Sequence, residues 1–158
     1  MSHISPFFVL PGEGASMDTL IDAPVTIKAG TRSTNGSLAV LEFVHGPKAG
    51  PPLHTHLRED EMWYVLQGDY RFKAGDSTFQ LSTGGMAFVP RGVSHSFQNL
   101  NDTPGRMLII FTPSGMERFF EQYAEQLPCS VDPEQLAAIA EANWMEFDGP
   151  PLAVSDPT

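Results

Sequence analysis

The sequence predicts an all-β barrel or sandwich that is followed by two α-helices. Short runs of aliphatic, aromatic and β-branched residues recur about every ten residues, with turn residues between them. The chain has 158 residues, of which 14 are Gly and 14 are Pro, and many of these separate the strand-like runs. Helical spacing of apolar residues occurs only after Pro113. We therefore expect residues 1–113 to form the barrel and residues 114–158 to pack on it within a single domain.

The expected strands are short runs in which apolar residues alternate or cluster between turn residues. Besides the segments around the histidines described below, they are Phe7–Leu10, Val25–Ala29, Leu38–Val44, Glu61–Leu66, Tyr70–Lys73, Thr78–Leu81, Met86–Val89 and Arg106–Thr112. Turns are expected at Thr31–Gly36 and at Ala74–Ser77, which gather Thr, Ser, Asn, Asp and Gly.

Two helix starts follow Pro113. The stretch Ser114–Glu117 has the S-x-x-E pattern of a capping box, and apolar residues then follow at helical spacing as far as Leu127. The second start is Asp132, an N-cap residue that precedes a Pro at the first helical position. Pro-rich sequence after Asp148 is expected to end this second helical region.

A pair of histidines precedes one of the strongest strand patterns. His54 and His56 are two residues apart, so on a β-strand both imidazoles leave the same face. After a short turn, Glu61 opens the next extended run. Two neutral imidazoles and one carboxylate on adjacent strands can converge on a single cation, and a third imidazole would complete a site of three His and one Glu.

His95 can supply that third imidazole. It follows a Pro-Arg-Gly turn and starts a strand in which it alternates with Phe97. The alternative is a core cluster of these residues without a metal, which is disfavoured because it would bury an unpaired carboxylate. We expect one divalent transition metal per chain, and the ligand set suits iron, nickel, cobalt, manganese, copper or zinc without choosing among them.

The spacing of these residues resembles the two sequence motifs of the cupin superfamily. The first motif is similar to His54-x-His56, four residues, Glu61, six residues, Gly68, although Lys48 stands where the family usually has its leading Gly. The second is similar to Gly84, five residues, Pro90-x-Gly92, two residues, His95, three residues, Asn99. The ends of the chain also resemble small single-domain cupins of the quercetin 2,3-dioxygenase-like group. The resemblance implies a jelly-roll β-barrel.

The same resemblance implies oxygen chemistry. In quercetin-dioxygenase-like cupins, the metal binds the deprotonated hydroxyl of a flavonol-type enol and dioxygen cleaves the ring. Carried over to this chain, His54, His56 and His95 would hold the metal, and Glu61 would be a fourth ligand and the catalytic base. The substrate would be flavonol-like or another enolisable aromatic or polyketide-like compound. A metal-dependent isomerase or cyclase and a non-catalytic small-molecule-binding cupin remain open, because the fold hosts many functions.

Strand alternation predicts which side chains line a pocket inside the barrel. The inward candidates are Phe43, Leu53, Trp63, Val65, Phe97, Leu108 and Ile110. Tyr70 and Arg91 are possible polar groups of the pocket, but surface positions are favoured for both. His45 lies in the loop before the first motif, where solvent exposure is favoured over a place at the cavity mouth.

Composition and charge argue against nucleic acid and a membrane as partners. The net charge is −10, with nine acids against one base from Glu117 onward, so nucleic-acid binding is not expected. No apolar run is long enough for a membrane span. The single cysteine, Cys129, cannot form an internal disulfide, and the N-terminus lacks the features of a secretion signal, so a cytoplasmic location is expected.

A homodimer is expected from the strand that carries Glu61. If Glu61 points inward, then Met62, Tyr64 and Leu66 point outward, although all three are large and mostly apolar. A strand that is apolar on both faces is normally covered on both. In a chain of this size, a second copy is the expected cover.

Overall fold

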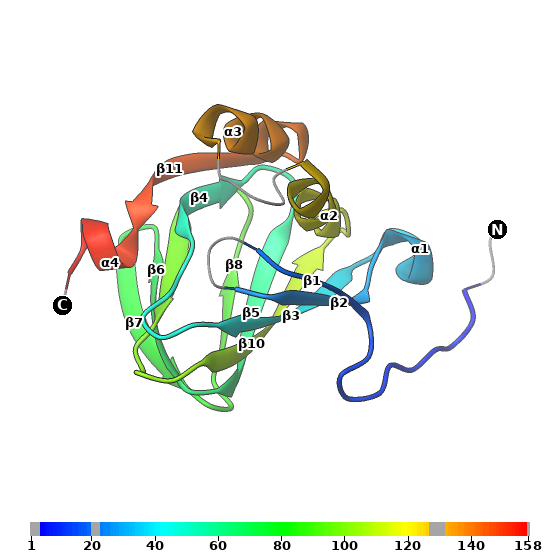
Figure 1. Cartoon of the computed structure of the whole chain (residues 1–158), viewed down its shortest axis with the longest axis horizontal. Helices are drawn as coiled ribbons and strands as arrows, with labels where there is room; N and C mark the ends of the chain where they lie inside the picture. Colours follow the sequence, from blue (N-terminus) through cyan, green and yellow to red (C-terminus); the bar gives the residue numbers. More distant parts are fainter. Residues whose placement is uncertain (1–3, 20–22, 127–131, 158) are drawn as a thin grey trace.

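In a computed structural model that describes residues 4–19, 23–126 and 132–157, two antiparallel sheets face each other around a common core (Figure 1). The six-stranded sheet has the order β1 (Ala15–Met17), β2 (Val25–Ala29), β3 (Ala39–His45), β10 (Gly105–Thr112), β5 (Asp60–Gln67), β8 (Met86–Val89). The five-stranded sheet has the order β11 (Met145–Pro151), β4 (Pro52–His56), β9 (His95–Asn99), β6 (Asp69–Ala74), β7 (Ser77–Ser82). The all-β fold class is therefore confirmed.

The helices lie outside the sheets. They are α1 (Thr31–Thr34), α2 (Glu117–Gln126), α3 (Pro133–Ala142) and α4 (Leu152–Ser155). Figure 1 shows α2 and α3 together at one end of the barrel, with α3 alongside β11. The two expected helices are present, but α3 ends at Ala142 and not at the Pro-rich sequence after Asp148, where β11 lies instead. Asp132 caps α3 by accepting hydrogen bonds from the backbone N–H groups of Glu134 and Gln135. Leu127 and Cys129 lie outside the described residues.

The strand that carries Glu61 has the expected alternation. Glu61, Trp63 and Val65 of β5 are buried, and Tyr64 between them is exposed. The inner face of β5 packs into a core of side chains from both sheets, because each sheet contributes every second residue of its strands to the interior. The alternation therefore fixes which side chains of β5 reach the space between the sheets.

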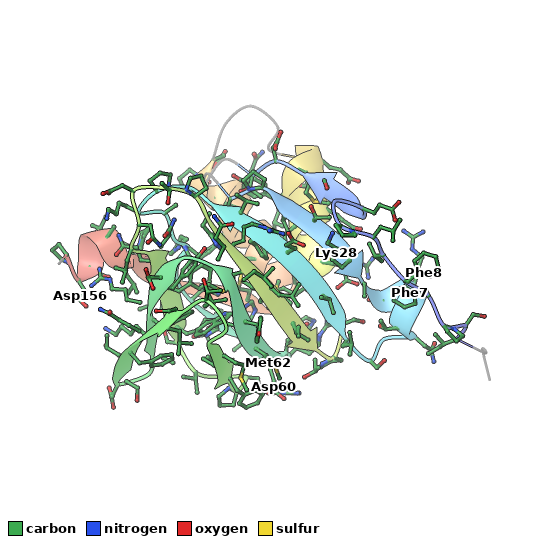
Figure 2. The ribbon with its side chains drawn as sticks, turned by 90° about the horizontal axis from the view of Figure 1, so that it is seen from below. Phe7, Phe8, Lys28, Asp60, Met62 and Asp156 are labelled. Atoms are coloured by element: carbon green, nitrogen blue, oxygen red, sulfur yellow. The ribbon has the colours of Figure 1, made fainter. Side chains whose placement is uncertain are left out.

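Two predictions at the N-terminal side are wrong. The segment Phe7–Leu10 is not a strand: its side chains are exposed, Phe8 by 83%, and Figure 2 shows Phe7 and Phe8 on the extended N-terminal segment. This apolar run has no strand beside it, so its pattern alone cannot make a sheet. The turn expected at Thr31–Gly36 contains the one-turn helix α1, which ends at Asn35 in the left-handed conformation. A helix therefore does precede Pro113.

Two strands were missed, the three-residue β1 and the longer β11. The stretch Met145–Pro151 forms β11, which pairs antiparallel with β4 and shifts register after Phe147. Its two prolines and its glycine obscure the strand pattern, but an edge strand tolerates proline because its outer N–H groups need no partner. As a result, β4 has a neighbouring strand on each side, β11 and β9, and both neighbours fix the position of its two histidines.

Candidate metal centre and its cavity

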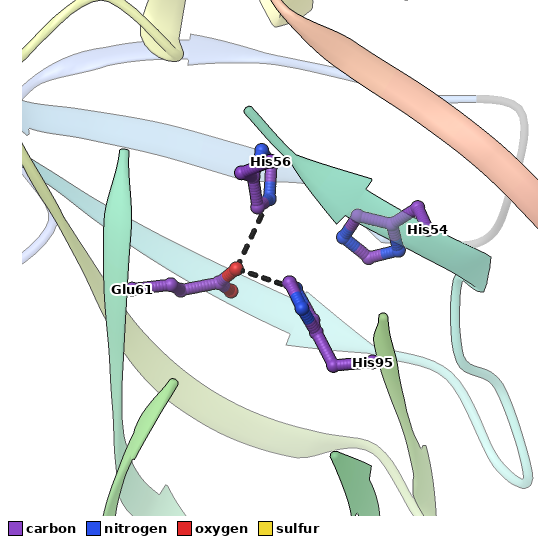
Figure 3. A group of neighbouring side chains, drawn as sticks. All are labelled: His54, His56, Glu61 and His95. Carbon is purple, nitrogen blue, oxygen red and sulfur yellow. Dashed lines mark hydrogen bonds and ion pairs between the residues drawn. The ribbon is translucent and has the colours of Figure 1, made fainter. Parts of the chain in front are cut away.

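Three strands bring the four predicted metal ligands together. His54 and His56 lie on β4, His95 lies opposite His54 on the neighbouring β9, and Glu61 reaches across from β5 in the other sheet. Figure 3 shows the four side chains pointing toward one another in the space between the sheets. All four residues are buried, and one potential ligand atom from each lies within 4.8 Å of the others. The four residues therefore form one buried cluster of three imidazoles and a carboxylate.

The carboxylate of Glu61 is the centre of the cluster. Its Oε2 lies 3.0 Å from Nε2 of His56 and 2.8 Å from Nε2 of His95 (Figure 3). Its Oε1 accepts a hydrogen bond from the indole N–H of Trp63. Trp63 thus orients the carboxylate, a role that the sequence did not reveal.

Backbone carbonyls set the orientation of two of the imidazoles. Nδ1 of His54 lies 2.7 Å from the carbonyl oxygen of Pro52, and Nδ1 of His95 lies 2.8 Å from that of Val93. Since a carbonyl only accepts, each Nδ1 carries the proton and donates it. Each Nε2 is then left for the centre of the cluster, which is the usual arrangement of a metal-binding histidine.

The electrostatics of the cluster favour an ionised Glu61. Burial alone would raise the pKa of Glu61, but His95 and His56 beside it hold that pKa well below its usual range. Burial and the neighbouring imidazoles of His95 and His56 lower the pKa of His54 well below its usual value, so His54 is neutral. Burial would also lower the pKa of His95, but Glu61 raises it. Without a cation, a proton on His95 balances the charge of the Glu61 carboxylate. A cation bound among these groups would balance that charge instead.

These residues fit a divalent transition-metal ion. Imidazole nitrogen and carboxylate oxygen bind such ions at about 2.0–2.2 Å, so ligand atoms on opposite sides of an ion lie about 4 Å apart. The mutual distances in the cluster, all within 4.8 Å, are close to that value. Nε2 of His56 faces the carboxylate of Glu61 at 3.0 Å, and its Nδ1 has no hydrogen-bond partner among the described residues. The cluster is thus a possible metal site, and the donor set does not choose the metal.

A cavity of about 90 Å³ opens beside the cluster. His54, His56 and Glu61 form part of its wall, and the remainder is mainly aromatic and aliphatic. These other wall residues come from β3, β9 and β10, from the helices α2 and α3, and from β11; they include Phe43, His45, Phe97, Ile109, Phe111, Phe119, Phe120, Tyr123, Leu136, Met145 and Phe147. A ligand in this cavity would reach the carboxylate and two imidazoles through apolar surroundings.

The seven predicted pocket residues have different positions. Phe43 and Phe97 line the cavity. Trp63 and Val65 are fully buried in the core but are not part of the lining, and Leu53 is half-buried outside it.

Leu108 and Ile110 lie on the outer face of β10, so the inward direction predicted for them is wrong. The inward residues of β10 are Met107, Ile109 and Phe111. The sequence held a signal for this, because the exposed Arg106 lies on the same face as Leu108 and Ile110.

The predictions for three polar residues also need correction or refinement. His45 is 2% exposed and lines the cavity, contrary to the expected solvent exposure. Tyr70 is fully buried rather than on the surface, and its hydroxyl contacts His45. Arg91 is on the surface as expected and pairs with Asp60 at 3.0 Å. The alternation that places Phe43 inward places His45 inward as well, so the signal for His45 was present in β3.

Comparisons with known proteins find a cupin domain in the middle of the chain. Residues 41–111 match the family described as a cupin domain. A 55-residue stretch is 33% identical to an uncharacterised protein from Streptomyces coelicolor, and it covers 35% of this chain and 51% of that protein. The chain thus spans about half the length of the curated relative it matches.

Solved structures extend the comparison to about 70% of the chain. The chain resembles KdgF from Halomonas sp. with a TM-score of 0.64 and 21% identity, over 72% of this chain and 99% of that one. It resembles an RmlC-like cupin from Shewanella frigidimarina with a TM-score of 0.62 and 20% identity, over 72% and 96%. It also resembles a sugar phosphate isomerase of the cupin superfamily from Silicibacter pomeroyi with a TM-score of 0.56 and 19% identity, over 70% and 77%.

The protein has a cupin fold, a jelly roll of two facing sheets followed by C-terminal helices. The cupin-domain match covers residues 41–111, and the cupin neighbours share the fold. The similarity to solved structures, at these levels of identity, concerns the fold alone. No helix in the described part of the chain is long and apolar enough to cross a membrane.

Proposed function

We propose that this protein is a metal-dependent cupin dioxygenase that acts on a compact enolisable compound, such as a single-ring aromatic or a diketone. The observation that carries the proposal is the buried carboxylate of Glu61, which faces three imidazoles at the polar end of an otherwise apolar cavity. The cavity volume of about 90 Å³ favours compact members of the class over a full flavonol, because sites for drug-sized ligands are typically about 300–1,000 Å³.

Each residue of the cluster has a defined part in this proposal. His54, His56 and His95 would hold the ion, with Glu61 as the fourth ligand. The ion would supply a Lewis acid that lowers the pKa of a bound enol hydroxyl. Oε2 of Glu61 would accept the enol proton, while the Trp63 N–H bond to Oε1 holds the carboxylate in place. The aromatic walls would exclude water and position a flat ring.

The apolar walls of the cavity also help to choose among the alternative functions. Within the described residues, no Lys or Arg lines the cavity, which disfavours a phosphorylated substrate. A metal-dependent isomerase or cyclase that acts on a neutral compound uses the same cluster without consuming oxygen. A binding module would use it without turnover.

Oxygen dependence tests the proposal. The metal-loaded protein is assayed with small diketones and flavonols in air and under anaerobic conditions, and turnover should require oxygen. Full anaerobic turnover would identify an isomerase or cyclase instead. The Glu61→Gln variant should retain most of its metal and lose turnover, and unchanged turnover in that variant would remove Glu61 from the role of base.

We also propose that the protein is a homodimer through the outer face of the six-stranded sheet. Met62 on β5 lies between Phe88 on β8 and Ile110 on β10, and Tyr64 is paired in the same way with Met86 and with Leu108; Figure 2 shows Met62 at the surface. Tyr64, Met86 and Phe88 are exposed by 42%, 54% and 56%.

This strip is continuous over three strands and ends at the edge strand β8. A second copy of the same face would remove both the apolar surface and the free edge from water.

A further inference from the structure

A fourth imidazole faces the cavity outside the metal cluster. His45 is the last residue of β3, lines the cavity and is 2% exposed. Its ring stacks on Phe43, with centroids 5.5 Å apart, and meets Phe97 edge to face at 4.9 Å. These two aromatic rings are themselves part of the cavity wall, so His45 is a polar group set into an apolar surface.

A buried tyrosine holds the ring of His45. The hydroxyl of Tyr70 lies 3.1 Å from Nδ1 of His45, and Tyr70 is fully buried. Gly105, the partner of His45 in the pairing of β10 with β3, leaves room for this contact, because a Cβ at that position would overlap the Tyr70 hydroxyl. Three strands therefore contribute to the placement of one imidazole.

The contact with Tyr70 determines which nitrogen carries the proton. The Tyr70 hydroxyl has no other hydrogen bond within the described part of the chain. A buried O–H without an acceptor costs roughly 1–3 kcal/mol, so the hydroxyl donates to Nδ1. The proton of the neutral ring is then on Nε2.

Nε2 of His45 opens on the cavity. It has no hydrogen bond to the described residues, and it is not among the atoms that are sealed from solvent without a partner. The ring stays neutral because burial lowers the pKa of His45 to about 3. His45 thus presents an uncharged N–H to whatever occupies the cavity.

The cavity joins this N–H to the metal cluster. Phe97, which touches His45, and His95 of the cluster are two residues apart on β9, and two residues of a strand span about 7 Å. The two polar points are therefore on the order of 10 Å apart.

We propose that His45 is a second recognition point for the ligand: its Nε2–H donates a hydrogen bond to a neutral acceptor oxygen, a carbonyl or an ether, at the end of the ligand remote from the metal cluster. The inference builds on the proposed function, since it takes the enolisable end to lie at Glu61. The proposed substrates are therefore those that carry a second hydrogen-bond acceptor on the side of an aromatic ring opposite the enolisable group. An uncharged donor among aromatic rings favours a neutral acceptor over a carboxylate, which would be buried without a counter-charge.

Two matched probes test this proposal without any need for turnover. They are 1-(4-methoxyphenyl)-1,3-butanedione, which has an ether oxygen across the ring from the diketone, and 1-(4-ethylphenyl)-1,3-butanedione, which has nearly the same shape and no acceptor there. Binding is measured by calorimetry with protein equilibrated with Zn²⁺, which has no redox chemistry. The wild type should bind the methoxy probe roughly 3- to 10-fold more tightly, the effect of one net hydrogen bond.

Variants of His45 identify the donor. His45→Leu should abolish the preference between the two probes, because it removes the donor. His45→Gln, whose amide N–H₂ can reach a similar point, should keep part of the preference. Equal affinity of the wild type for both probes, no binding of either probe, or a preference that persists in His45→Leu would overturn the proposal.

A measurement on the free protein provides an independent check. Imidazole ¹⁵N chemical shifts should show His45 protonated at Nε2 and unprotonated at Nδ1. In Tyr70→Phe this tautomer preference should be lost. A proton on Nδ1 in the wild type would overturn the assignment. If the probes discriminate as expected but no compound is oxidised, the proposed dioxygenase activity fails while the recognition role of His45 stands.

Discussion

His45 should make the stability of the fold depend on pH between about 3 and 6.5. Its pKa is lowered from the usual 6.5 to about 3 because the ring is buried among Phe43, Tyr70 and Phe97. Tyr70, the titratable group in contact with it, has its own pKa raised by burial and stays protonated throughout this range. The replacement His45→Gln removes the titrating group and keeps a polar side chain of similar length.

The sign of the effect follows from proton binding. A group with a lowered folded-state pKa binds protons more readily in the unfolded chain, so acid favours unfolding. The free energy of unfolding therefore has its full value above pH 6.5, where His45 is neutral in both states, and it decreases as the pH falls toward 3. Between pH 7 and pH 5, a shift of this size lowers the free energy of unfolding by about 2 kcal/mol.

Urea denaturation at pH 7 and at pH 5 measures this loss. The wild type should lose about 2 kcal/mol more than His45→Gln between the two conditions. The protein is kept free of metal, so that the titration of the cluster histidines is the same in both proteins and cancels in the comparison.

Tyr70→Phe is the control, because it removes the hydrogen bond but not the burial, which is the cause of the pKa shift. It should keep the pH dependence of the wild type. Equal losses in the wild type and His45→Gln would refute the assignment of His45 as a buried neutral group.

Three further predictions concern the cluster, the dimer and the core. His54→Ala should lower metal affinity at least about 10-fold by removing a ligand, whereas His45→Gln should retain the metal, as measured by metal analysis after dialysis. Met62→Glu should convert the dimer to monomer in light scattering, because it places a charge in the outer strip, and a dimer of unchanged strength would move the interface elsewhere. Gly105→Ala should lower the free energy of unfolding by about 1–3 kcal/mol, because its Cβ overlaps the Tyr70 hydroxyl. Gly149→Ala, which meets only Leu53 atoms at 3.8 Å and beyond, should cost less, and equal losses would contradict the packing argument.

The ligand cluster could be predicted from the sequence because it depends on local geometry. His54 and His56 leave one face of β4 by strand parity alone, and parity on β5 places Glu61 inward together with Trp63. Glu61 and His95 lie on strands of different sheets. Their contact was expected only from the resemblance to known motifs and not from the spacing of the residues.

The cavity wall could not be predicted in the same way. Most of it comes from long-range packing, in which α2, α3 and β11 cover one end of the barrel. On β10, the central apolar run covers both faces, so only the exposed Arg106 at its start indicates that Ile110 points outward and Ile109 inward. His45 was misjudged because a histidine before a Gly/Pro-rich loop resembles a surface residue, and only its pairing opposite Gly105 places it beside Tyr70.

The missed strand β11 gives the C-terminal region a part in the site. Oδ2 of Asp148 accepts hydrogen bonds from the hydroxyls of Thr55 and Ser94, each at 2.6 Å. Thr55 lies between the two histidines of β4, and Ser94 directly precedes His95. One carboxylate from β11 therefore ties together the two segments that carry the imidazoles, from the side opposite the cavity.

The same strand also places Met145 and Phe147 in the cavity wall. The region after residue 113 therefore contributes to the wall of the candidate site. Any ion held by the cluster would stabilise the docking of β11, and the docking of β11 would in turn favour the ion, because each orders the same two histidine-bearing segments.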